Sequence, residues 1–130
     1  MPACPFCDNR NAVLANEFAF ACLDINPVNP GHLLILPRRH VATWFEATAE
    51  EQAALLALLD AGKCLLDERF APAGYNIGIN IGEVAGQTIM HLHVHLIPRY
   101  RGDCADPRGG VRGVIPAKQW YPAEGGGDAR

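Results

Sequence analysis

The sequence predicts an α+β fold, in which an antiparallel-rich sheet of about five strands carries one long helix on a face. Several short apolar or alternating segments, bounded by Pro, Gly and Asn, have the length of strands. A single longer segment has helical periodicity and a helix start signal. The chain has 130 residues, 49% of them hydrophobic and 19% charged. These values predict one domain over residues 1–130, compact over about 4–116.

The first strand is predicted over residues 18–23, which are apolar and rich in aromatic side chains. Residues 24–31 contain two prolines, two asparagines and a glycine, which is typical of a turn. Residues 32–36 are predicted to form a short buried strand that Pro37 ends. Cys22 and Cys64 stand in apolar surroundings, and we expect both to be small core residues.

The long helix is predicted to begin after Thr48. Its hydroxyl oxygen can accept a hydrogen bond from the backbone N–H three residues on, while Glu51 reaches back to the free N–H of Thr48. The following apolar residues recur at helical spacing, so the helix should run to about Arg69 and pack on the sheet. This stripe consists of Leu55, Leu58, Leu59, Gly62, Leu65, Leu66 and Phe70.

Residues 75–82 alternate strictly and predict a further strand with two different faces. One face is apolar and consists of Tyr75, Ile77, Ile79 and Ile81. The other consists of Asn76, Gly78, Asn80 and Gly82. Glycine weakens a strand, so two glycines on one face suggest that something approaches the backbone closely. Either a ligand or a bulge with a crossing element would explain them.

Three of the five histidines alternate with apolar residues in the segment 91–98. Because side chains of a strand alternate between faces, His91, His93 and His95 should share one face over an apolar support. A neutral imidazole is a nucleophile, a proton carrier or a metal ligand. A merely polar outer face is a further interpretation. The binding of one metal by all three is disfavoured, since the outer two lie about 13 Å apart along an extended strand, but two of them could hold a metal with ligands from elsewhere in the chain.

From Arg99 onward the chain is rich in Gly and Pro. We expect an extended tail over 117–130, disordered over 125–130, and anchored by the few apolar residues of this region. These are Val111, Val114, Ile115, Trp120 and Tyr121.

The formal net charge is −3 and the positive residues are scattered, so no partner of the nucleic-acid duplex type is expected. No apolar run has membrane-spanning length, and the N-terminus does not look like a signal peptide. We therefore expect a cytoplasmic protein without a membrane partner. In that compartment thiols stay reduced, so the five cysteines do not predict a disulfide framework.

The histidine pattern, with Gly86-Gln87-Thr88 before it and Pro98-Arg99 after it, resembles the histidine-triad (HIT) family. The resemblance extends from Cys4 to about Arg112. It includes the positions of Asp24, Asn26, Pro30-Gly31-His32, Pro37 and His40. It implies a HIT-like fold and a two-step transfer of nucleoside monophosphate groups through a covalent nucleotidyl-histidine intermediate. It also implies that two protomers pair as a homodimer.

Residue roles follow from the same resemblance. His93 would be the nucleophile, while His95 and His32 would flank the phosphate and move protons. The residues that would bind the purine nucleotide are Asp24, Ile25, Asn26, Asn80, Gln87 and Thr88. Within this set, Asp24 would accept hydrogen bonds from the ribose and Ile25 would lie against the base.

The N-terminal Cys4-Pro5-Phe6-Cys7 has the spacing of a metal-binding pair. Several bacterial HIT proteins look similar in using such a pair with a later histidine and the first triad histidine to hold zinc. The implied ligands of a structural Zn²⁺ are Cys4, Cys7, His40 and His91. The alternatives are a redox pair, for which the usual strand-then-helix setting is lacking, and a pair without metal.

The resemblance implies hydrolysis of a nucleoside monophosphate ester, anhydride or phosphoramidate. Ile97-Pro98-Arg99 with Gly102-Asp103 is more similar to the dinucleoside-polyphosphate hydrolases than to the phosphoramidases. A transferase with a phosphate acceptor is a weaker candidate, because the chain is far shorter than the uridylyltransferases. A nucleotide-binding regulatory module with vestigial catalysis and a metal-dependent enzyme that uses the histidines as ligands remain as alternatives.

Overall fold

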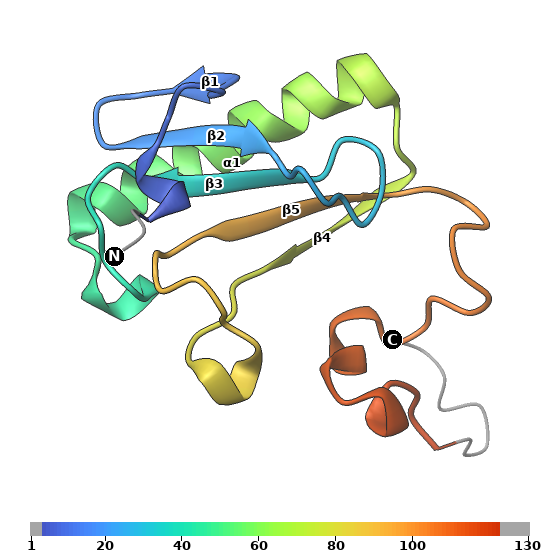
Figure 1. The fold of residues 1–130 in the computed structure, drawn as a ribbon. Helices are drawn as coiled ribbons and strands as arrows, with labels where there is room; N and C mark the ends of the chain where they lie inside the picture. Colours follow the sequence, from blue (N-terminus) through green and yellow to red (C-terminus); the bar gives the residue numbers. More distant parts are fainter. Residues whose placement is uncertain (1–3, 123–130) are drawn as a thin grey trace. The chain divides into compact units, whose positions relative to one another are not determined.

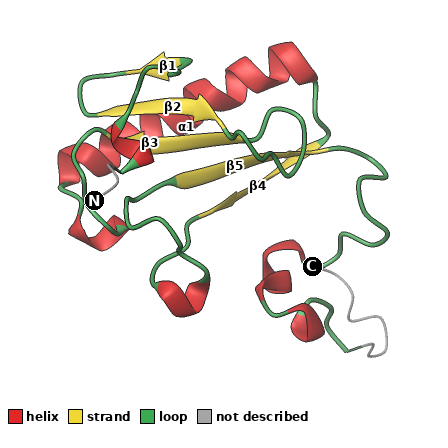
Figure 2. Cartoon of the chain, in the orientation of Figure 1, coloured by secondary structure: helices red, strands yellow, loops and turns green. Residues whose placement is uncertain are grey.

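The structure is a computed structural model that describes residues 4–122. The chain divides into two compact units, Met1–Arg99 and Tyr100–Arg130. The first unit is a five-stranded antiparallel sheet with one long helix, so the predicted α+β fold is confirmed (Figures 1 and 2). The predicted disorder of residues 125–130 lies outside the described residues.

The strands lie in the order β1-β2-β3-β5-β4, and every neighbouring pair is antiparallel. Their bounds are Leu14–Ala15 (β1), Ala19–Leu23 (β2), Leu33–Pro37 (β3), Gly74–Gly78 (β4) and Val94–Arg99 (β5). The predicted bounds of β2 and β3 agree to within one residue at each end. Pro37 is the last residue of β3 and pairs with Ala19, rather than lying beyond the strand.

Helix α1 spans Ala49–Phe70 and begins as predicted. The Thr48 hydroxyl accepts a hydrogen bond from the Glu51 N–H at 3.1 Å, and the Thr48 N–H donates to the Glu51 carboxylate at 2.8 Å. The predicted stripe faces the sheet, because Leu55, Leu58, Gly62 and Leu66 are all buried. The prediction of a buried Cys64 was wrong: residues 62 and 66 face the sheet, so residue 64 points away and is exposed.

The sheet has a separate apolar cluster on each face. On the α1 side, alternate residues of β2, β3 and β5 pack with the helix, among them Ala21, Ile35 and Leu96. On the other side Phe20, Leu34 and Leu36 form a smaller cluster, against which Phe6 packs. Figure 1 shows α1 behind the sheet and the N-terminal turn η1 (Pro5–Cys7) in front of it. The second face is therefore covered by a short turn and not by a helix.

Strand β4 is shorter than predicted because its partner ends. Gly78 pairs with His95, and β5 begins only one residue earlier, at Val94. Residues 79–82 therefore leave the sheet and lead into a short turn, η3 (Glu83–Ala85). His91 and His93 likewise precede β5 rather than lying within it. The alternation of the segment persists there, since the apolar residue between these two histidines is buried in the core on the α1 side.

The second unit contains two short helical turns, η4 (Gly110–Val114) and η5 (Pro116–Lys118). The guanidinium of Arg112 lies 4.1 Å from the centre of the Tyr121 ring. The tail is thus not extended through residues 116–118. The five apolar residues that were predicted to anchor it have exposed fractions between 42% and 81%. Within residues 4–122, no helix is both long and apolar enough to cross a membrane.

Candidate active site and metal cluster

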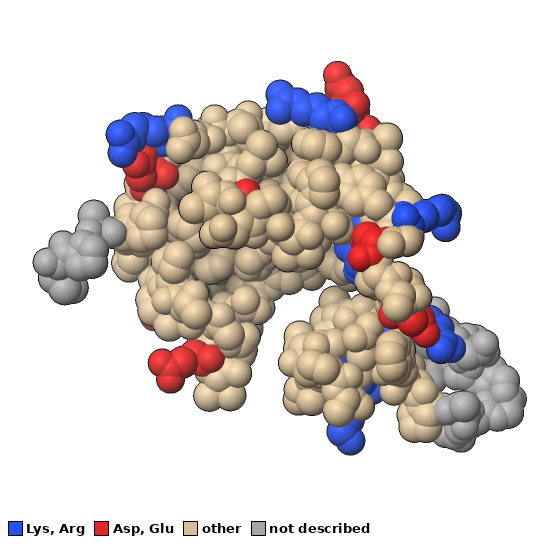
Figure 3. All heavy atoms as spheres, turned by 45° about the vertical axis from the view of Figure 1, so that its right-hand side comes forward, with Lys and Arg blue, Asp and Glu red and all other residues tan. Residues whose placement is uncertain are grey.

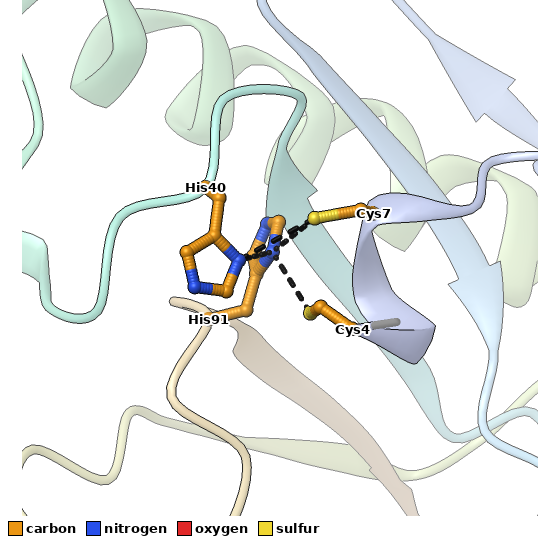
Figure 4. Close-up of side chains that lie close together, drawn as sticks. All are labelled: Cys4, Cys7, His40 and His91. Carbon is orange, nitrogen blue, oxygen red and sulfur yellow. Dashed lines mark hydrogen bonds between the residues drawn. The ribbon is translucent and has the colours of Figure 1, made fainter. Parts of the chain in front are cut away.

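The four predicted metal ligands lie together (Figure 4). Cys4 precedes the turn η1 and Cys7 is its last residue, His40 follows β3, and His91 precedes β5. The Nδ1 atom of His91 lies 3.5 Å from the Sγ atom of each cysteine and 3.2 Å from the Nδ1 atom of His40. The Sγ atom of Cys7 lies 3.4 Å from the same His40 nitrogen. Three separate segments of the chain thus converge on one point.

These distances fit a tetrahedral metal ion. With Zn–S bonds of about 2.3 Å and Zn–N bonds of about 2.0 Å, tetrahedral geometry separates a sulfur from a nitrogen by about 3.5 Å. Two nitrogens are separated by about 3.3 Å in the same geometry. The observed sulfur to nitrogen distances are 3.4, 3.5 and 3.5 Å, and the nitrogens are 3.2 Å apart. A Cys₂His₂ set leaves no open coordination position, which is typical of a structural site.

The hydrogen bond of His91 prepares it as a ligand. Its Nε2 atom lies 2.9 Å from the carbonyl oxygen of Pro37, which can only accept. The imidazole proton therefore resides on Nε2, and the lone pair of Nδ1 points toward the two sulfurs. Burial lowers the pKa of His91, so the ring stays neutral. A carbonyl that fixes the tautomer of a ligating histidine is common around metal ions.

His93 has the opposite arrangement of its two nitrogens. Its Nδ1 atom lies 2.8 Å from the backbone carbonyl oxygen of His91, so Nδ1 carries the proton and donates. The lone pair is then on Nε2, the nitrogen on the far side of the ring. An imidazole held in this way can attack an electrophile without first losing a proton.

A backbone amide sets the protonation of the other two predicted catalytic histidines. The Val28 N–H donates to Nδ1 of His32 at 3.0 Å, so His32 carries its own proton on Nε2. That proton points to Nδ1 of His95, 2.9 Å away. His95 must then carry its proton on Nε2. The relay Val28–His32–His95 therefore presents one N–H of His95 as a donor.

Burial keeps both histidines of this relay neutral. It is the main cause that lowers the pKa of His95 to about 4, and the neighbouring His93 and His32 lower it further. Burial also lowers the pKa of His32, while the carboxylate of Asp24 acts in the opposite direction. The nearest carboxylate oxygen of Asp24 lies 3.7 Å from Nε2 of His32.

Asp24, His32 and His95 also lie close enough to hold a metal ion, but the hydrogen bonds oppose it. To ligate through Nε2, a neutral His32 would need its proton on Nδ1. That nitrogen already faces the Val28 N–H, so two donors would then meet. The tautomers thus separate the two groups: His91 offers a lone pair to the cysteines, whereas His32 offers a proton. The tautomer of His32 thus argues against the use of these histidines as ligands of a catalytic metal.

Gln87 lies in the loop before the triad, and its side-chain amide is engaged by backbone groups of nearby loops. Its amide group donates to the carbonyl oxygens of Ala42 at 2.7 Å and Ile89 at 3.2 Å, and accepts from the Gly82 N–H at 2.9 Å. The residue is only 2% exposed. The amide thus holds the loop closed, and a direct contact with a phosphate would require these bonds to break. Of the other predicted donors, Asn80 is partly buried and Thr88 is exposed.

A pocket of about 370 Å³ lies on the sheet face opposite α1. Its floor includes Phe20, Leu34 and Leu36, and its rim includes Asp24 and Ile25. Ile25 is 91% exposed, so its side chain is available to a flat ligand. The backbone N–H of the predicted binding residue Asn26 donates to the Asp24 carboxylate at 2.9 Å and thereby fixes it.

Charged side chains are sparse on the surface of this unit that Figure 3 shows. The Lys, Arg, Asp and Glu side chains of the unit stand mainly near its outline, and the area between them is almost entirely uncharged. Several charged side chains of this unit are paired, as Arg10 is with Asp8 and Lys63 is with Asp67. The positive charges visible there do not form a stripe.

Phe6 is a site residue that the sequence did not reveal. Its ring lies edge-on to that of His93, with centroids 4.8 Å apart, and it also lines the pocket. The sequence pattern of residues 4–7 indicates a metal-binding pair of cysteines, and the phenylalanine between them belongs to no motif. The only signal was an aromatic residue between the two cysteines of a short turn.

The HIT domain profile matches residues 8–102, and the chain therefore belongs to the HIT family. A protein of Mycobacterium tuberculosis described as AP-4-A phosphorylase is 36% identical over 110 residues, which cover 78% of this chain and 56% of that protein. A bis(5'-nucleosyl)-tetraphosphatase (asymmetrical) of Schizosaccharomyces pombe is 35% identical over 90 residues, covering 69% of this chain and 50% of that protein. The chain thus spans about half the length of these two relatives.

A solved structure of a zinc-bound histidine triad family protein from Mycobacterium smegmatis superimposes with a TM-score of 0.70. The two sequences are 30% identical, and the match covers 78% of each chain. The fold of the first unit is therefore that of a HIT protein, as the histidine pattern predicted.

Proposed function

We propose that this protein is a nucleotide hydrolase or transferase that cleaves at the α-phosphate of AMP-X substrates, through a covalent nucleotidyl group on His93. The observation that carries the proposal is the hydrogen bond from His93 Nδ1 to the His91 carbonyl oxygen, which leaves an unprotonated Nε2. The names of the two relatives favour dinucleoside polyphosphates as substrates. Nucleoside phosphoramidates are the second class.

In the first step, Nε2 of His93 forms a bond to the α-phosphorus while the bond from that phosphorus to the leaving group breaks. A polyphosphate leaves as an anion, whereas an amine must take up a proton. The N–H of His95 is the donor that the relay presents for charge on the phosphate or for a leaving amine. The ring centres of His93 and His95 are 5.0 Å apart, so one phosphate group can contact both residues.

In the second step, an acceptor oxygen forms a bond to phosphorus and the bond to His93 breaks. Water as acceptor releases AMP, and inorganic phosphate as acceptor releases ADP. The relative described as a phosphorylase favours phosphate, and the relative described as a tetraphosphatase favours water. The first relative gives the phosphate acceptor more weight than chain length alone suggested.

The nucleoside would occupy the pocket beside the histidines. An adenine ring would lie on the apolar floor under Ile25. Its binding would remove the exposed Ile25 side chain from water. The Asp24 carboxylate at the rim would accept hydrogen bonds from the ribose hydroxyls. Residues of the loop before the triad, Thr88 and the nearby Asn80, would supply donors to the phosphate.

We further propose that Cys4, Cys7, His40 and His91 hold a structural Zn²⁺ ion. The tetrahedral spacing of the donor atoms and the tautomer of His91 support this. Four protein ligands would leave the ion no role in the reaction, so it would stabilise the fold by joining the N-terminal turn to the catalytic segment. The zinc-bound relative has the same fold.

A homodimer and a cytoplasmic location complete the proposal. Strand β4 is at the edge of the sheet, and Ile77 on it is half exposed, as is Leu56 on α1. Pairing across this edge would cover Ile77. Sedimentation equilibrium of wild type and Ile77→Lys tests it: a monomeric wild type would contradict the dimer. Reduced thiols of a cytoplasmic protein also suit zinc binding by the two cysteines.

The test follows AMP, ADP and ATP in mixtures of the protein with diadenosine tetraphosphate or an adenosine phosphoramidate, each with and without inorganic phosphate. Wild type should release AMP, or ADP when phosphate is present. His93→Ala should be slower by at least about a thousandfold, as expected for loss of a covalent nucleophile.

All five histidines lie in the two sites, so the chain offers no histidine elsewhere as a matched control. His93→Gly with added imidazole replaces it, because the free ring can enter the vacated space and should restore part of the release. A His93→Ala protein that cleaves as fast as wild type would refute the nucleophile. Tight AMP binding without turnover of any substrate would favour the regulatory module.

A further inference from the structure

Phe6 lies between two ligands of the metal cluster and contacts the candidate nucleophile. It is the third residue of the Cys4–Cys7 segment, within the turn η1. Its ring meets that of His93 at an interplanar angle of 72° with centroids 4.8 Å apart, and that of His91 at 6.3 Å. Edge-on pairs of this kind are attractive and directional. The orientation of the His93 ring therefore depends partly on where Phe6 is held.

The same side chain forms part of the pocket wall. Phe6 packs against the apolar cluster of Phe20, Leu34 and Leu36, which is the pocket floor. No other residue of the pocket lining also contacts a triad ring among the aromatic contacts of residues 4–122. Phe6 thus joins the metal cluster, the nucleophile and the pocket.

The turn that carries Phe6 has little to hold it apart from the two cysteines and the packing of the Phe6 ring itself. It is three residues long, has no side-chain cap and contains no buried residue. Its backbone bonds are those from Cys7 N–H to the Cys4 carbonyl at 3.1 Å and from Asp8 N–H to the Pro5 carbonyl at 3.4 Å. Short turns of this kind open locally at low free energy. A metal ion bound on both sides of Phe6 would suppress that opening.

We propose that Phe6 is a positioning residue through which metal in the cluster strengthens nucleotide binding in the adjoining pocket. The inference rests on the proposed function, because it takes the pocket as the nucleotide site. With the ion bound, Phe6 stays against the pocket floor and the His93 ring. Without the ion, the turn opens and the wall is lost. Coupling between two sites is reciprocal, so the nucleotide must strengthen metal binding by the same factor.

The metal cluster and the nucleophile are also connected through His91, and this second connection does not involve Phe6. The contribution of Phe6 can therefore be tested alone. The His91 carbonyl accepts from His93 whatever residue stands at position 6, and all four metal ligands remain in a Phe6→Ala protein. This variant therefore removes the aromatic contact and keeps the cluster and the nucleophile's hydrogen bond. Phe6→Leu restores an apolar wall. Phe45→Ala is the matched control, because Phe45 is also in a short turn but is largely exposed and absent from the pocket lining.

The experiment measures the dissociation constant of AMP by titration calorimetry, with zinc-loaded protein and with protein stripped by a chelator. For wild type and Phe45→Ala, removal of zinc should weaken AMP binding by about tenfold, within the usual range of coupling. For Phe6→Ala, AMP should bind the loaded protein about tenfold more weakly, and zinc should change this by less than about twofold. Phe6→Leu should recover part of both effects. Far-UV circular dichroism verifies that the stripped proteins are folded.

The reciprocal titration covers the case in which a stripped protein unfolds. Competition with a chelator gives the zinc affinity of the loaded proteins with and without AMP, and only wild type and Phe45→Ala should gain about tenfold from AMP. Equal gains in Phe6→Ala would overturn the proposal, as would AMP binding that is indifferent to zinc in folded wild type. A large loss of zinc affinity in Phe6→Ala without AMP would also overturn it, since Phe6 would then hold the cluster. Zinc-loaded wild type that binds no AMP would instead refute the nucleotide site itself.

Discussion

Acidification should destabilise the protein through His95 well before most carboxylates titrate. The usual pKa of 6.5 falls to about 4 in the fold, so the unfolded chain binds more protons between these values. The neutral ring therefore contributes full stability above pH 6.5, and this contribution is lost as the pH falls toward 4. Between pH 8 and pH 5, the two pKa values give a loss of about 2 kcal/mol in the free energy of unfolding. The lowered pKa of His32 acts in the same direction.

Urea denaturation at a series of pH values, with zinc at one fixed concentration, measures this loss. The matched variant is His95→Asn, which keeps a side chain of similar size without a group that titrates in this range. Protonation of cysteines and metal loss affect both proteins alike, so the difference between their pH profiles isolates the contribution of His95. Wild type should lose about 2 kcal/mol more than the variant between pH 8 and pH 5. Parallel profiles would refute the neutral, buried relay on which the tautomer assignment depends.

Two further predictions concern the fold that positions the site. A methyl group on Gly62 would lie 2.7 Å from a Leu33 methyl carbon in the buried core, so Gly62→Ala should lower the free energy of unfolding by about 1–2 kcal/mol despite its better helix propensity. Unchanged or higher stability in urea denaturation would contradict this close packing. Glu51 is 4% exposed and accepts from an arginine and a backbone N–H, so Glu51→Ala should cost about 2–3 kcal/mol, against about 1 kcal/mol for Thr48→Ala. Thermal unfolding compares the two, and equal losses would mean that the ion pair adds nothing.

The sequence predicts those features of this protein that depend on local pattern. The capping box located the start of α1 because its two hydrogen bonds involve residues only three positions apart. The alternation around the triad identified which side chains enter the core, even where the segment is not a strand. The metal ligands were implied by a family pattern, and the structure brings their ligand atoms within 4.8 Å of one another.

Features that depend on distant partners were not predictable in the same way. The end of β4 at Gly78 is set by where β5 begins, and no residue near position 78 encodes it. The two-residue strand β1 is too short to show any period. Gln87 was expected to face a phosphate, yet its amide is engaged by carbonyls of residues 42 and 89. A side chain with both donors and acceptors fits either role, and only the fold decides between them.

The relay that begins at Val28 has a direction that side-chain substitution cannot reverse. A main-chain amide has a proton to give and no lone pair to receive one, so every group after it must accept on one side and donate on the other. The asymmetry of the site thus originates in the path of the turn between β2 and β3, outside the triad itself. Two HIT proteins with identical histidines but differently folded turns at this point would present the Nε2 atom of His95 to the same phosphate in opposite states, as an N–H donor in one and as a lone pair in the other. Comparing such proteins by histidine pattern alone would miss the difference.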